Sequence, residues 1–125
     1  NLIHCDVKPD NVFVRGEAAA REFLLGDLGA ACSVREAQNG RHQTGSPAYA
    51  APERGDGRLG FTADLYSLGV MLFEAVTGSP PFEGGPREVA RSHASAPAPV
   101  ERVANGFLRD LIGGLLEKDP AQRIQ

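Results

Sequence analysis

The chain has 125 residues, of which 42% are hydrophobic and 23% charged, enough to form the core of one compact domain. Thirteen basic and sixteen acidic residues give a net charge of -3, which argues against a broad electrostatic surface for nucleic acid. The composition also disfavours a membrane protein and a disordered tail. Two cysteines, Cys5 and Cys32, are too few for a disulfide framework, so we expect small buried side chains and a cytoplasmic location.

Two short apolar runs, at residues 12–14 and 23–25, lie on either side of a polar connection. They predict two brief strands that form a hairpin-like element. Residues 29–60 are rich in Gly, Ser, Pro, Ala and charge without periodicity, which predicts a long surface segment with at most one helical turn. Loops of that length are often functional.

An apolar stretch that follows Thr62, a suitable N-cap, predicts a central helix over about residues 62–77. Val70 and Met71 cover much of the surface left by its main apolar face, so we expect burial nearly all round. That face contains Leu65, Leu68, Leu72, Phe73 and Val76. The span falls short of the roughly 20 apolar residues that cross a bilayer, so we expect no membrane segment. Gly78 is expected to end the helix.

Two further helices are predicted after the central one. Pro86 suits the first position of a short helix through Arg91, and residues 97–99 are expected to be irregular. A last helix is predicted over residues 103–117, ending before Pro120. It is expected to bury Phe107, Leu108, Leu111, Ile112, Leu115 and Leu116. Because no repeat or linker divides the chain, we expect a single, mainly α unit with a small β element over residues 1–125.

Four polar residues are candidates for chemistry: Asp6, Asn11, Asp27 and Glu53. Taken singly, Asp6 in its turn-forming surroundings is most simply a turn residue, and Asp27 beside a glycine is a bend after a strand. Their order and spacing together favour a functional interpretation.

Residues 4–11, His-Cys-Asp-Val-Lys-Pro-Asp-Asn, resemble the H-R-D-x-K-P-x-N catalytic loop of eukaryotic-type protein kinases. Residues 27–29, Asp-Leu-Gly, are similar to that family's D-F-G, and residues 45–53 resemble the G-T-x-x-Y-x-A-P-E that ends its activation segment. Residues 64–69, 77–82 and 119–123 are similar to D-x-W-S-x-G, T-G-x-x-P-F and D-P-x-x-R. These six matches occur in the family's order and cover nearly the whole chain.

The resemblance implies a partial protein-kinase-like C-lobe, without the nucleotide-binding N-lobe, from a serine/threonine kinase that uses ATP and Mg²⁺. In that scheme Asp6 accepts or orients the proton of a protein Ser/Thr hydroxyl, and Lys8 neutralises charge on the transferred γ-phosphoryl group. Asn11 and Asp27 would hold magnesium, and with it the nucleotide phosphates. Lys8 follows the serine/threonine pattern of the family rather than its tyrosine-directed pattern.

Other matches imply structural roles. Glu53 is expected to form a buried pair with Arg123 that ties the activation segment to the end of the domain. Asp64 is expected to accept hydrogen bonds from N–H groups of the catalytic loop. His4 is expected to pack beneath that loop as a core histidine rather than to act as a base.

One residue of the activation segment and one of the catalytic loop differ from the family pattern. Ser46, where the family usually has threonine, is expected to position the substrate by hydrogen bonding toward Asp6 and Lys8. Cys5 stands where the family commonly has an arginine that pairs with an activation-segment phosphate. We therefore predict that phosphorylation of Thr44 or of nearby hydroxyls is not the main switch.

Residues 55–60 fit a G-x-G-x-x-G pattern literally, but no strand precedes them and no lysine follows until Lys118, so we expect only a flexible loop. Without an N-lobe, we expect the isolated chain to have little transferase activity and to expose apolar surface that causes association. Two alternatives remain, a pseudokinase or truncated scaffold that binds partners, and a helical domain with chance matches. Intact Asp6, Lys8, Asn11 and Asp27 argue against a decayed enzyme.

Overall fold

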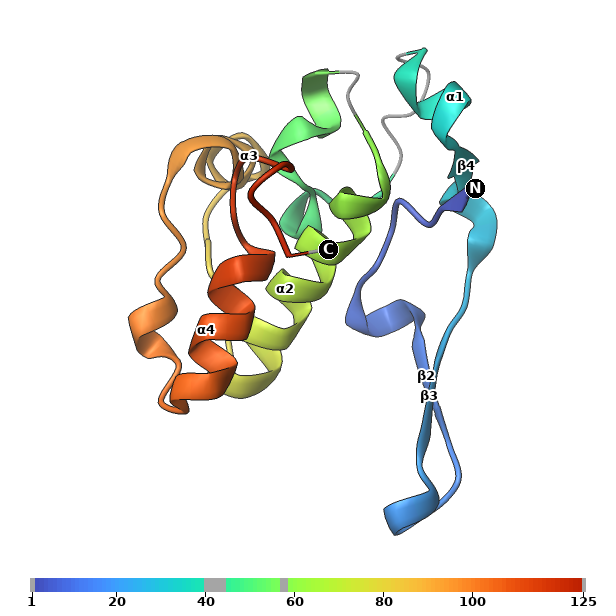
Figure 1. Ribbon diagram of the computed structural model, residues 1–125, viewed down its shortest axis with the longest axis vertical. Helices are drawn as coiled ribbons and strands as arrows, with labels where there is room; N and C mark the ends of the chain where they lie inside the picture. The colour runs from blue at the N-terminus through green and yellow to red at the C-terminus, as the bar shows by residue number, and fades with distance from the viewer. Residues whose placement is uncertain (1, 40–44, 57–58, 125) are drawn as a thin grey trace.

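A computed structural model describes residues 2–39, 45–56 and 59–124 (Figure 1). In these ranges about half of the chain is helical and a small β element is present, which agrees with the predicted fold class. The strands and α-helices in chain order are β1 (Leu2–Ile3), β2 (Val12–Arg15), β3 (Glu22–Leu25), β4 (Cys32–Ser33), α1 (Val34–Gln38), α2 (Phe61–Thr77), α3 (Pro86–Ser95) and α4 (Gly106–Leu115), and short 3-10 turns lie in several of the connections.

Helix α2 runs through the middle of the molecule, with α4 packed along it (Figure 1). It begins after Gly60 rather than at a Thr62 cap, and it ends at Gly78, whose φ of 81° needs a residue that tolerates the left-handed region. The buried side of α2 consists of Ala63, Tyr66, Ser67, Gly69, Val70 and Phe73.

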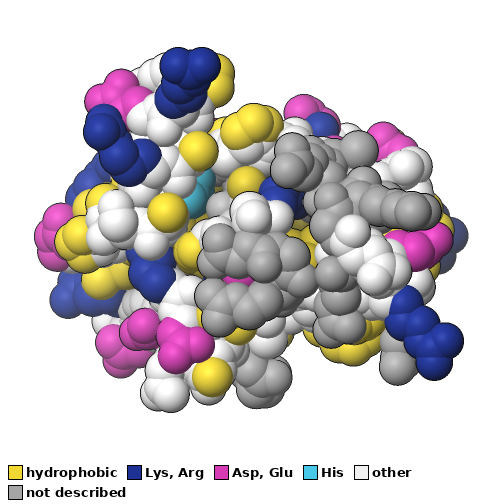
Figure 2. All heavy atoms as spheres, turned by 90° about the horizontal axis from the view of Figure 1, so that it is seen from above, with side chains coloured by type: hydrophobic (Ala, Val, Ile, Leu, Met, Phe, Trp, Pro, Cys, Tyr) yellow, Lys and Arg dark blue, Asp and Glu magenta, His cyan; other side chains and the backbone are white. Residues whose placement is uncertain are grey.

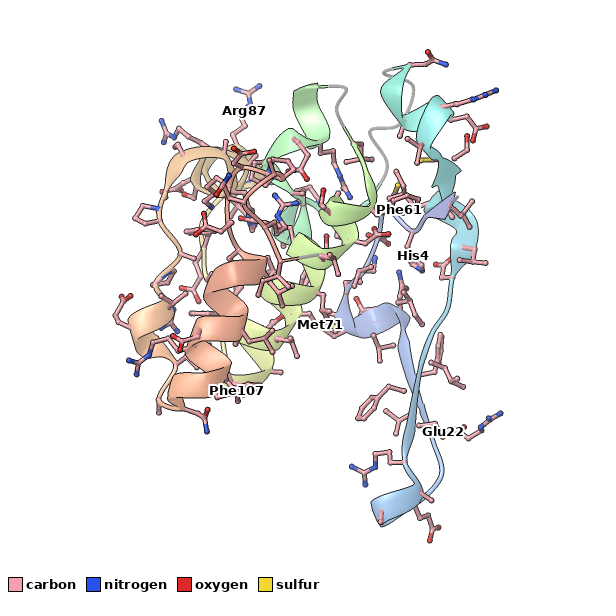
Figure 3. The ribbon with its side chains drawn as sticks, viewed as in Figure 1. His4, Glu22, Phe61, Met71, Arg87 and Phe107 are labelled. Carbon is pink, nitrogen blue, oxygen red and sulfur yellow. The ribbon has the colours of Figure 1, made fainter. Side chains whose placement is uncertain are left out.

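The prediction that α2 is buried nearly all round is wrong in part. Val76 is 45% exposed, and Leu65, Leu68, Met71 and Leu72 are only half-buried. The reason is that three of these side chains, Leu65, Leu68 and Met71, line an apolar hollow of about 330 Å³ between α2 and the β2–β3 hairpin. Figure 3 shows Met71 on the side of α2 that faces this hairpin.

Helix α4 is shorter than predicted, and Phe107 does not belong to the core. The Asn105 side chain accepts a hydrogen bond from the N–H of Leu108 at 3.0 Å, which starts the helix three residues after Val103. Phe107 then lies on the exposed first turn and is 77% exposed (Figure 3). Of the six side chains expected to be buried, Ile112, Leu115 and Leu116 are.

The described residues between 29 and 60 contain more regular structure than the predicted surface loop. Ser33 and Glu36 form a reciprocal capping box that begins α1, because the Ser33 hydroxyl accepts from the Glu36 N–H and the Glu36 carboxylate accepts from the Ser33 N–H. Ala37, Ala51 and Leu59 from this segment are buried in the core. Residues 40–44 and 57–58, and with them Thr44 and part of the glycine-rich pattern, lie outside the described residues.

Helix α3 confirms the predicted start and extends the predicted end. Pro86 occupies its first turn, and the helix continues four residues past Arg91 to Ser95. Residues 97–99 are irregular, as expected. The helix lies against the 3-10 turns at Pro47–Tyr49 and Pro52–Asp56, which come from the segment before α2.

The predicted hairpin is confirmed, and it projects away from the helices (Figure 1). Strands β2 and β3 pair antiparallel from Val12 opposite Leu25 to Arg15 opposite Glu22. A second, smaller pair joins β1 to β4, with Ile3 opposite Cys32. Large apolar side chains of the hairpin stay at the surface, namely Phe13, Val14, Phe23, Leu24 and Leu25.

On the face drawn in Figure 2, basic and acidic side chains alternate around the rim, with neutral side chains between them. The coloured part of this face therefore offers no continuous surface of one charge. Within the described ranges, no helix has both the length and the apolar character needed to cross a membrane.

Candidate active site

The backbone at the start of the predicted catalytic loop is held by Asp64, from the first turn of α2. Its Oδ2 accepts a hydrogen bond from the His4 N–H at 2.7 Å, and its Oδ1 accepts one from the Cys5 N–H at 2.9 Å. Cys5 has a φ of 66°, in the left-handed region that costs a non-glycine residue of order 1–3 kcal/mol. The central helix therefore fixes a strained turn directly before Asp6.

His4 is buried and joins this turn to the end of the hairpin. Its Nε2 lies 3.0 Å from the Gly26 carbonyl oxygen, which can only accept, so Nε2 carries the proton. The Asp6 N–H approaches Nδ1 at 3.4 Å. His4 thus acts as a core histidine that links the backbone of Asp6 to the residue before Asp27.

Asp6, Lys8 and Ser46 come together in one cluster. The Lys8 Nζ lies 2.8 Å from Asp6 Oδ2 and donates to the Ser46 hydroxyl at 2.9 Å, and the Ser46 N–H donates to Asp6 Oδ1 at 2.8 Å. Ser46 follows Asp6 by forty residues, so these contacts bring the activation segment onto the catalytic loop. The contacts expected of Ser46 are present.

Asp6 and Lys8 each stabilise the charged form of the other. Partial burial raises the pKa of the Asp6 carboxyl, but hydrogen bonds from Lys8 and from the Ser46 N–H and hydroxyl outweigh it and lower the pKa to about 2. The hydrogen bond with Asp6 raises the pKa of Lys8. At neutral pH Asp6 is therefore an anionic acceptor of low basicity, suited to orienting a hydroxyl, beside a fixed cation.

Asn11 and Asp27 both lie at the base of the hairpin, Asn11 before its first strand and Asp27 after its second. Asn11 directly precedes β2, and its carbonyl oxygen accepts from the Gly26 N–H at 2.9 Å, which brings Asp27 to the next position. The Asn11 side-chain amide donates to the Asp6 carbonyl at 2.8 Å and to Asp6 Oδ2 at 3.1 Å. The hairpin therefore carries both predicted metal ligands to the edge of the cluster.

Asp27 makes fewer contacts with this cluster than Asn11 does. It has a φ of 59°, and its Oδ1 accepts from the Gly29 N–H at 3.1 Å, so the carboxylate caps its own turn. In the described ranges, its carboxylate makes no direct hydrogen bond to Asp6 or Asn11. The structure brings Asp6 and Asn11 into contact and leaves Asp27 beside them at the surface.

These donor atoms suit a hard divalent cation. The Asn11 NH₂ group is engaged by Asp6, which leaves the amide oxygen as its ligand atom, and Asp27 Oδ2 remains beside the capping Oδ1. Amide and carboxylate oxygens are the ligands that Mg²⁺ prefers, and it usually shares its coordination with waters and phosphates. Each of the two residues therefore offers an oxygen atom of the kind that a magnesium ion takes as a ligand.

Two residues that the sequence analysis did not single out shape the back of the site. Gly45, with a φ of 114°, passes so close to Cys5 that a Cβ would collide with the Cys5 carbonyl oxygen. The Arg54 guanidinium donates to that same carbonyl. Burial lowers the pKa of Arg54, and nearby acidic groups, Asp6 and Asp64 among them, oppose that shift. The structure thus adds a cation behind the catalytic loop.

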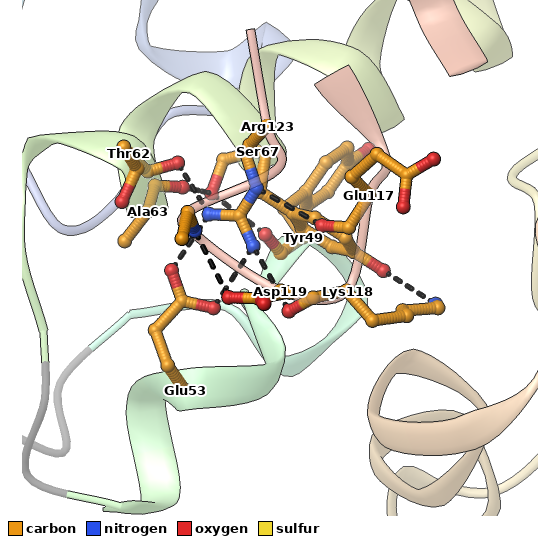
Figure 4. A network of polar contacts seen from close by, with 11 residues as sticks. Tyr49, Glu53, Thr62, Ala63, Ser67, Glu117, Lys118, Asp119 and Arg123 are labelled. Atoms are coloured by element: carbon orange, nitrogen blue, oxygen red, sulfur yellow. Dashed lines mark hydrogen bonds and ion pairs between the residues drawn. The ribbon is translucent and has the colours of Figure 1, made fainter. Parts of the chain in front are cut away.

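The predicted Glu53–Arg123 pair is present and fully buried (Figure 4). Arg123 Nη1 and Nη2 donate to the two Glu53 oxygens at 2.6 and 3.0 Å, and the side chains are 0% and 2% exposed. The guanidinium also donates to the carbonyls of Thr62 and Glu117 at 2.6 and 3.0 Å. One side chain therefore joins the activation segment, the start of α2 and the end of the chain.

A second polar network joins the activation segment to α2 and α3. The Tyr49 hydroxyl donates to Glu74 at 2.6 Å, and the Ser67 hydroxyl donates to the Tyr49 carbonyl at 2.7 Å. His93 Nε2 donates to the Ala48 carbonyl at 2.8 Å, since a carbonyl only accepts. The role of His93 could not be recognised from the sequence because its partner lies 45 residues away.

Comparison with known proteins agrees with this geometry. The family model described as "Protein kinase domain" matches residues 1–125. Serine/threonine-protein kinase pkn2 of Myxococcus xanthus is 37% identical over 99% of this chain, and the match covers 16% of the relative. Serine/threonine-protein kinase PkaA of Streptomyces coelicolor is 36% identical over 98% of this chain and 23% of the relative.

A human relative, serine/threonine-protein kinase ULK3, is 34% identical over 99% of this chain and 27% of its own length. The chain thus spans only 16 to 27% of these three relatives. Kinases of this family use ATP and Mg²⁺. Since the family model covers the whole chain and three serine/threonine kinases align with nearly all of it, the chain belongs to the protein kinase family.

Proposed function

We propose that residues 1–125 form the partial C-lobe of a serine/threonine protein kinase, from its catalytic loop to near the end of the kinase domain. In this proposal the longer protein contributes the nucleotide-binding N-lobe and transfers the γ-phosphoryl group of ATP to a protein Ser/Thr hydroxyl in the cytoplasm. The Asp6–Lys8–Ser46 cluster with Asn11 is the observation that carries it. The names of the relatives support the choice of acceptor.

Each side chain then has a distinct task. Asp6, anionic at neutral pH, orients the acceptor hydroxyl and receives its proton as the new P–O bond forms. Lys8 lies 2.8 Å from Asp6 and neutralises charge that develops on the transferred phosphoryl oxygens. Ser46 holds the activation segment against both residues, which positions the substrate chain.

Asn11 and Asp27 supply the oxygen ligands for Mg²⁺, which neutralises nucleotide phosphate charge when bound. Both residues sit at the base of the hairpin, so the pairing of Asn11 with Gly26 sets the spacing of the two ligands. Glu53, Arg123, Asp64 and His4 keep the two loops in place without touching substrate.

The test is phosphoryl transfer by the full-length protein to a generic protein acceptor, with labelled ATP and Mg²⁺. Asp6→Asn is expected to lower kcat by about 100-fold or more, as for the loss of a positioned acid–base group. Asp110→Asn, which alters an exposed carboxylate on α4, is the matched control and should retain the parent rate. Equal rates for the Asp6→Asn and parent proteins would reject the proposal.

The same assay on the 125-residue chain separates the proposal from its alternative. We expect little or no turnover from the chain alone, because half of the nucleotide cleft is missing. We also expect association, because apolar side chains such as Phe13, Phe23 and Leu28 are 55%, 69% and 62% exposed. Full-length protein that binds partners but never transfers phosphate would favour the alternative, a pseudokinase or truncated scaffold.

A further inference from the structure

The two cysteines, 27 residues apart in the chain, meet in the core behind the candidate site. Cys5 Sγ lies 3.4 Å from Cys32 Sγ, and the residues are 3% and 2% exposed. Strands β1 and β4 bring them together by pairing Ile3 with Cys32, two residues before Cys5. Both are free thiols, and neither takes part in the proposed phosphoryl transfer.

We propose that Cys5 and Cys32 are a covalent modification site, at which a hydroperoxide forms a reversible disulfide that ties the catalytic loop to β4. A disulfide has sulfurs about 2.0 Å apart, so the two sulfurs need to approach by only about 1.4 Å. The chemistry of this pair does not depend on the proposed kinase activity.

The reaction balances with hydrogen peroxide as the oxidant. One cysteine, as its thiolate, attacks a peroxide oxygen and becomes a sulfenic acid, while the other peroxide oxygen leaves and takes up a proton to give water. The second thiol attacks the sulfenic sulfur, forms the S–S bond and expels a second water. Two thiols are thus oxidised, and one peroxide is reduced to two waters.

The surroundings make this reaction slow and dependent on pH. Burial, the hydrogen bond with Cys32 and the nearby Asp64 carboxylate raise the pKa of Cys5 to about 12 although the Arg54 cation opposes the shift, so Cys5 is a thiol at neutral pH. Access requires opening of the β1–β4 pair, which contains only two residue pairs. The rate of disulfide formation is therefore expected to rise with pH.

The position of the bond links it to the metal ligands. The Cys5 backbone is held on both sides, by Asp64 at its N–H and by Arg54 at its carbonyl. The displacement therefore falls on Cys32 and β4, which follow Asp27 by five residues. If the proposed function holds, displacement of the chain after Asp27 lowers phosphoryl transfer, because a misplacement of about 1 Å can cost about 100-fold.

Peptide mapping tests the covalent site directly. Full-length protein is treated with hydrogen peroxide, alkylated without reduction and digested with trypsin. The expected product joins residues 22–35, which contain Cys32, to the peptide that ends at Arg15 and contains Cys5. Dithiothreitol should separate the two peptides, and the Cys5→Ser and Cys32→Ser variants should yield no such product.

Separate alkylation or sulfinic oxidation of the two peptides, without the joined species, would overturn the proposal. Cys32→Ala provides a second variant that preserves an apolar side chain if serine disturbs the core. In parallel, peroxide should lower the phosphoryl-transfer rate of the parent reversibly and leave Cys32→Ala unaffected. A joined peptide with an unchanged rate would reject the inhibitory effect, and absence of activity before oxidation would instead count against the proposed function.

Discussion

Helices α2 and α4 and the β2–β3 hairpin contain the same kinds of large apolar side chain but bury them to different extents. Phe73 on α2 is 0% exposed and Ile112 on α4 is 0% exposed, whereas Phe13 and Phe23 on the hairpin are 55% and 69% exposed. The helices cover each other, while the hairpin projects away from them. Composition alone therefore does not decide where the core forms.

The candidate site lies at the junction of these two regions. Asp64 belongs to α2 and anchors the loop that carries Asp6, while Asn11 and Asp27 lie at the base of the hairpin. In the proposed function, the acid–base residue thus depends on the buried region and the metal ligands depend on the exposed one. Substitutions in the two regions are expected to separate the stability of the fold from the arrangement of the metal ligands.

The largest expected effect comes from the buried ion pair. Arg123→Ala leaves Glu53 buried and unpaired and is expected to lower the free energy of unfolding by about 3–5 kcal/mol. The matched change in the hairpin, Arg15→Ala, breaks an ion pair with Glu22 whose side chains are 71% and 57% exposed. It should cost at most about 1 kcal/mol. Urea unfolding of both variants measures the difference, and equal losses would contradict it.

Substitution of one phenylalanine in each region compares the contributions of apolar side chains to stability. Phe73→Ala empties a fully buried position between the helices and is expected to lower the free energy of unfolding by about 3–5 kcal/mol. Phe13→Ala removes a half-exposed ring and should cost about 1 kcal/mol. Thermal or urea denaturation checks both values. A larger loss for Phe13→Ala would mean that the hairpin contributes more to the core than its exposure indicates.

The pH dependence of the free energy of unfolding should report the protonation of His93, a buried histidine in the helical region. Burial lowers the pKa of His93 from 6.5 to about 4, a shift that the hydrogen bond to Ala48 opposes and Lys118 reinforces. The unfolded chain therefore binds a proton between pH 6.5 and 4 that the folded chain does not. Stability is lost as pH falls through this window, by at most about 3 kcal/mol.

His93→Gln should abolish this part of the pH dependence. Unfolding of the parent and the variant is compared at several pH values from 7.5 to 4, where the two stability curves should converge toward acid pH. The hairpin strands contain no histidine, so their contribution should stay constant through the window. Parallel curves for the two proteins would show that His93 titrates normally.

The smallest expected difference in the free energy of unfolding is between substitutions of two glycines, Gly69 and Gly26. A Cβ at Gly69 would lie 2.8 Å from the Leu115 Cβ, so Gly69→Ala should force α2 and α4 apart and cost about 1–3 kcal/mol. A Cβ at Gly26 would meet the ring of Phe13, which is exposed and free to turn. Gly26→Ala should therefore be nearly neutral in the same unfolding measurement, and an equal cost at both sites would contradict this account.

The elements that the sequence predicts correctly are those with a local signal. The hairpin follows from two short apolar runs, and α2 follows from a long apolar stretch that ends at Gly78. The prediction that Phe107 belongs to the core is wrong: its spacing matches Leu111 and Leu115, but the Asn105 cap decides which turn is exposed. The pattern does not predict the order in the described residues between 29 and 60, because a capping box and packing, not periodicity, create it.

The candidate site shows the same division. The spacing of the motifs indicates Asp6, Lys8, Asn11 and Asp27 because these residues lie within short segments of the chain. The contribution of Arg54 depends on a contact with a carbonyl 49 residues away, which no local pattern specifies. The meeting of the two cysteines likewise follows from pairing between distant strands.

The most direct test of the account is the affinity of the full-length protein for Mn²⁺, used as a magnetic probe for Mg²⁺ with a non-hydrolysable ATP analogue. We predict that Asn11→Ala and Asp27→Ala each weaken Mn²⁺ binding by about tenfold or more, while the distant Asp110→Asn leaves it unchanged. Affinity equal to that of the parent in both variants would contradict the claim that the base of the hairpin holds the metal ion.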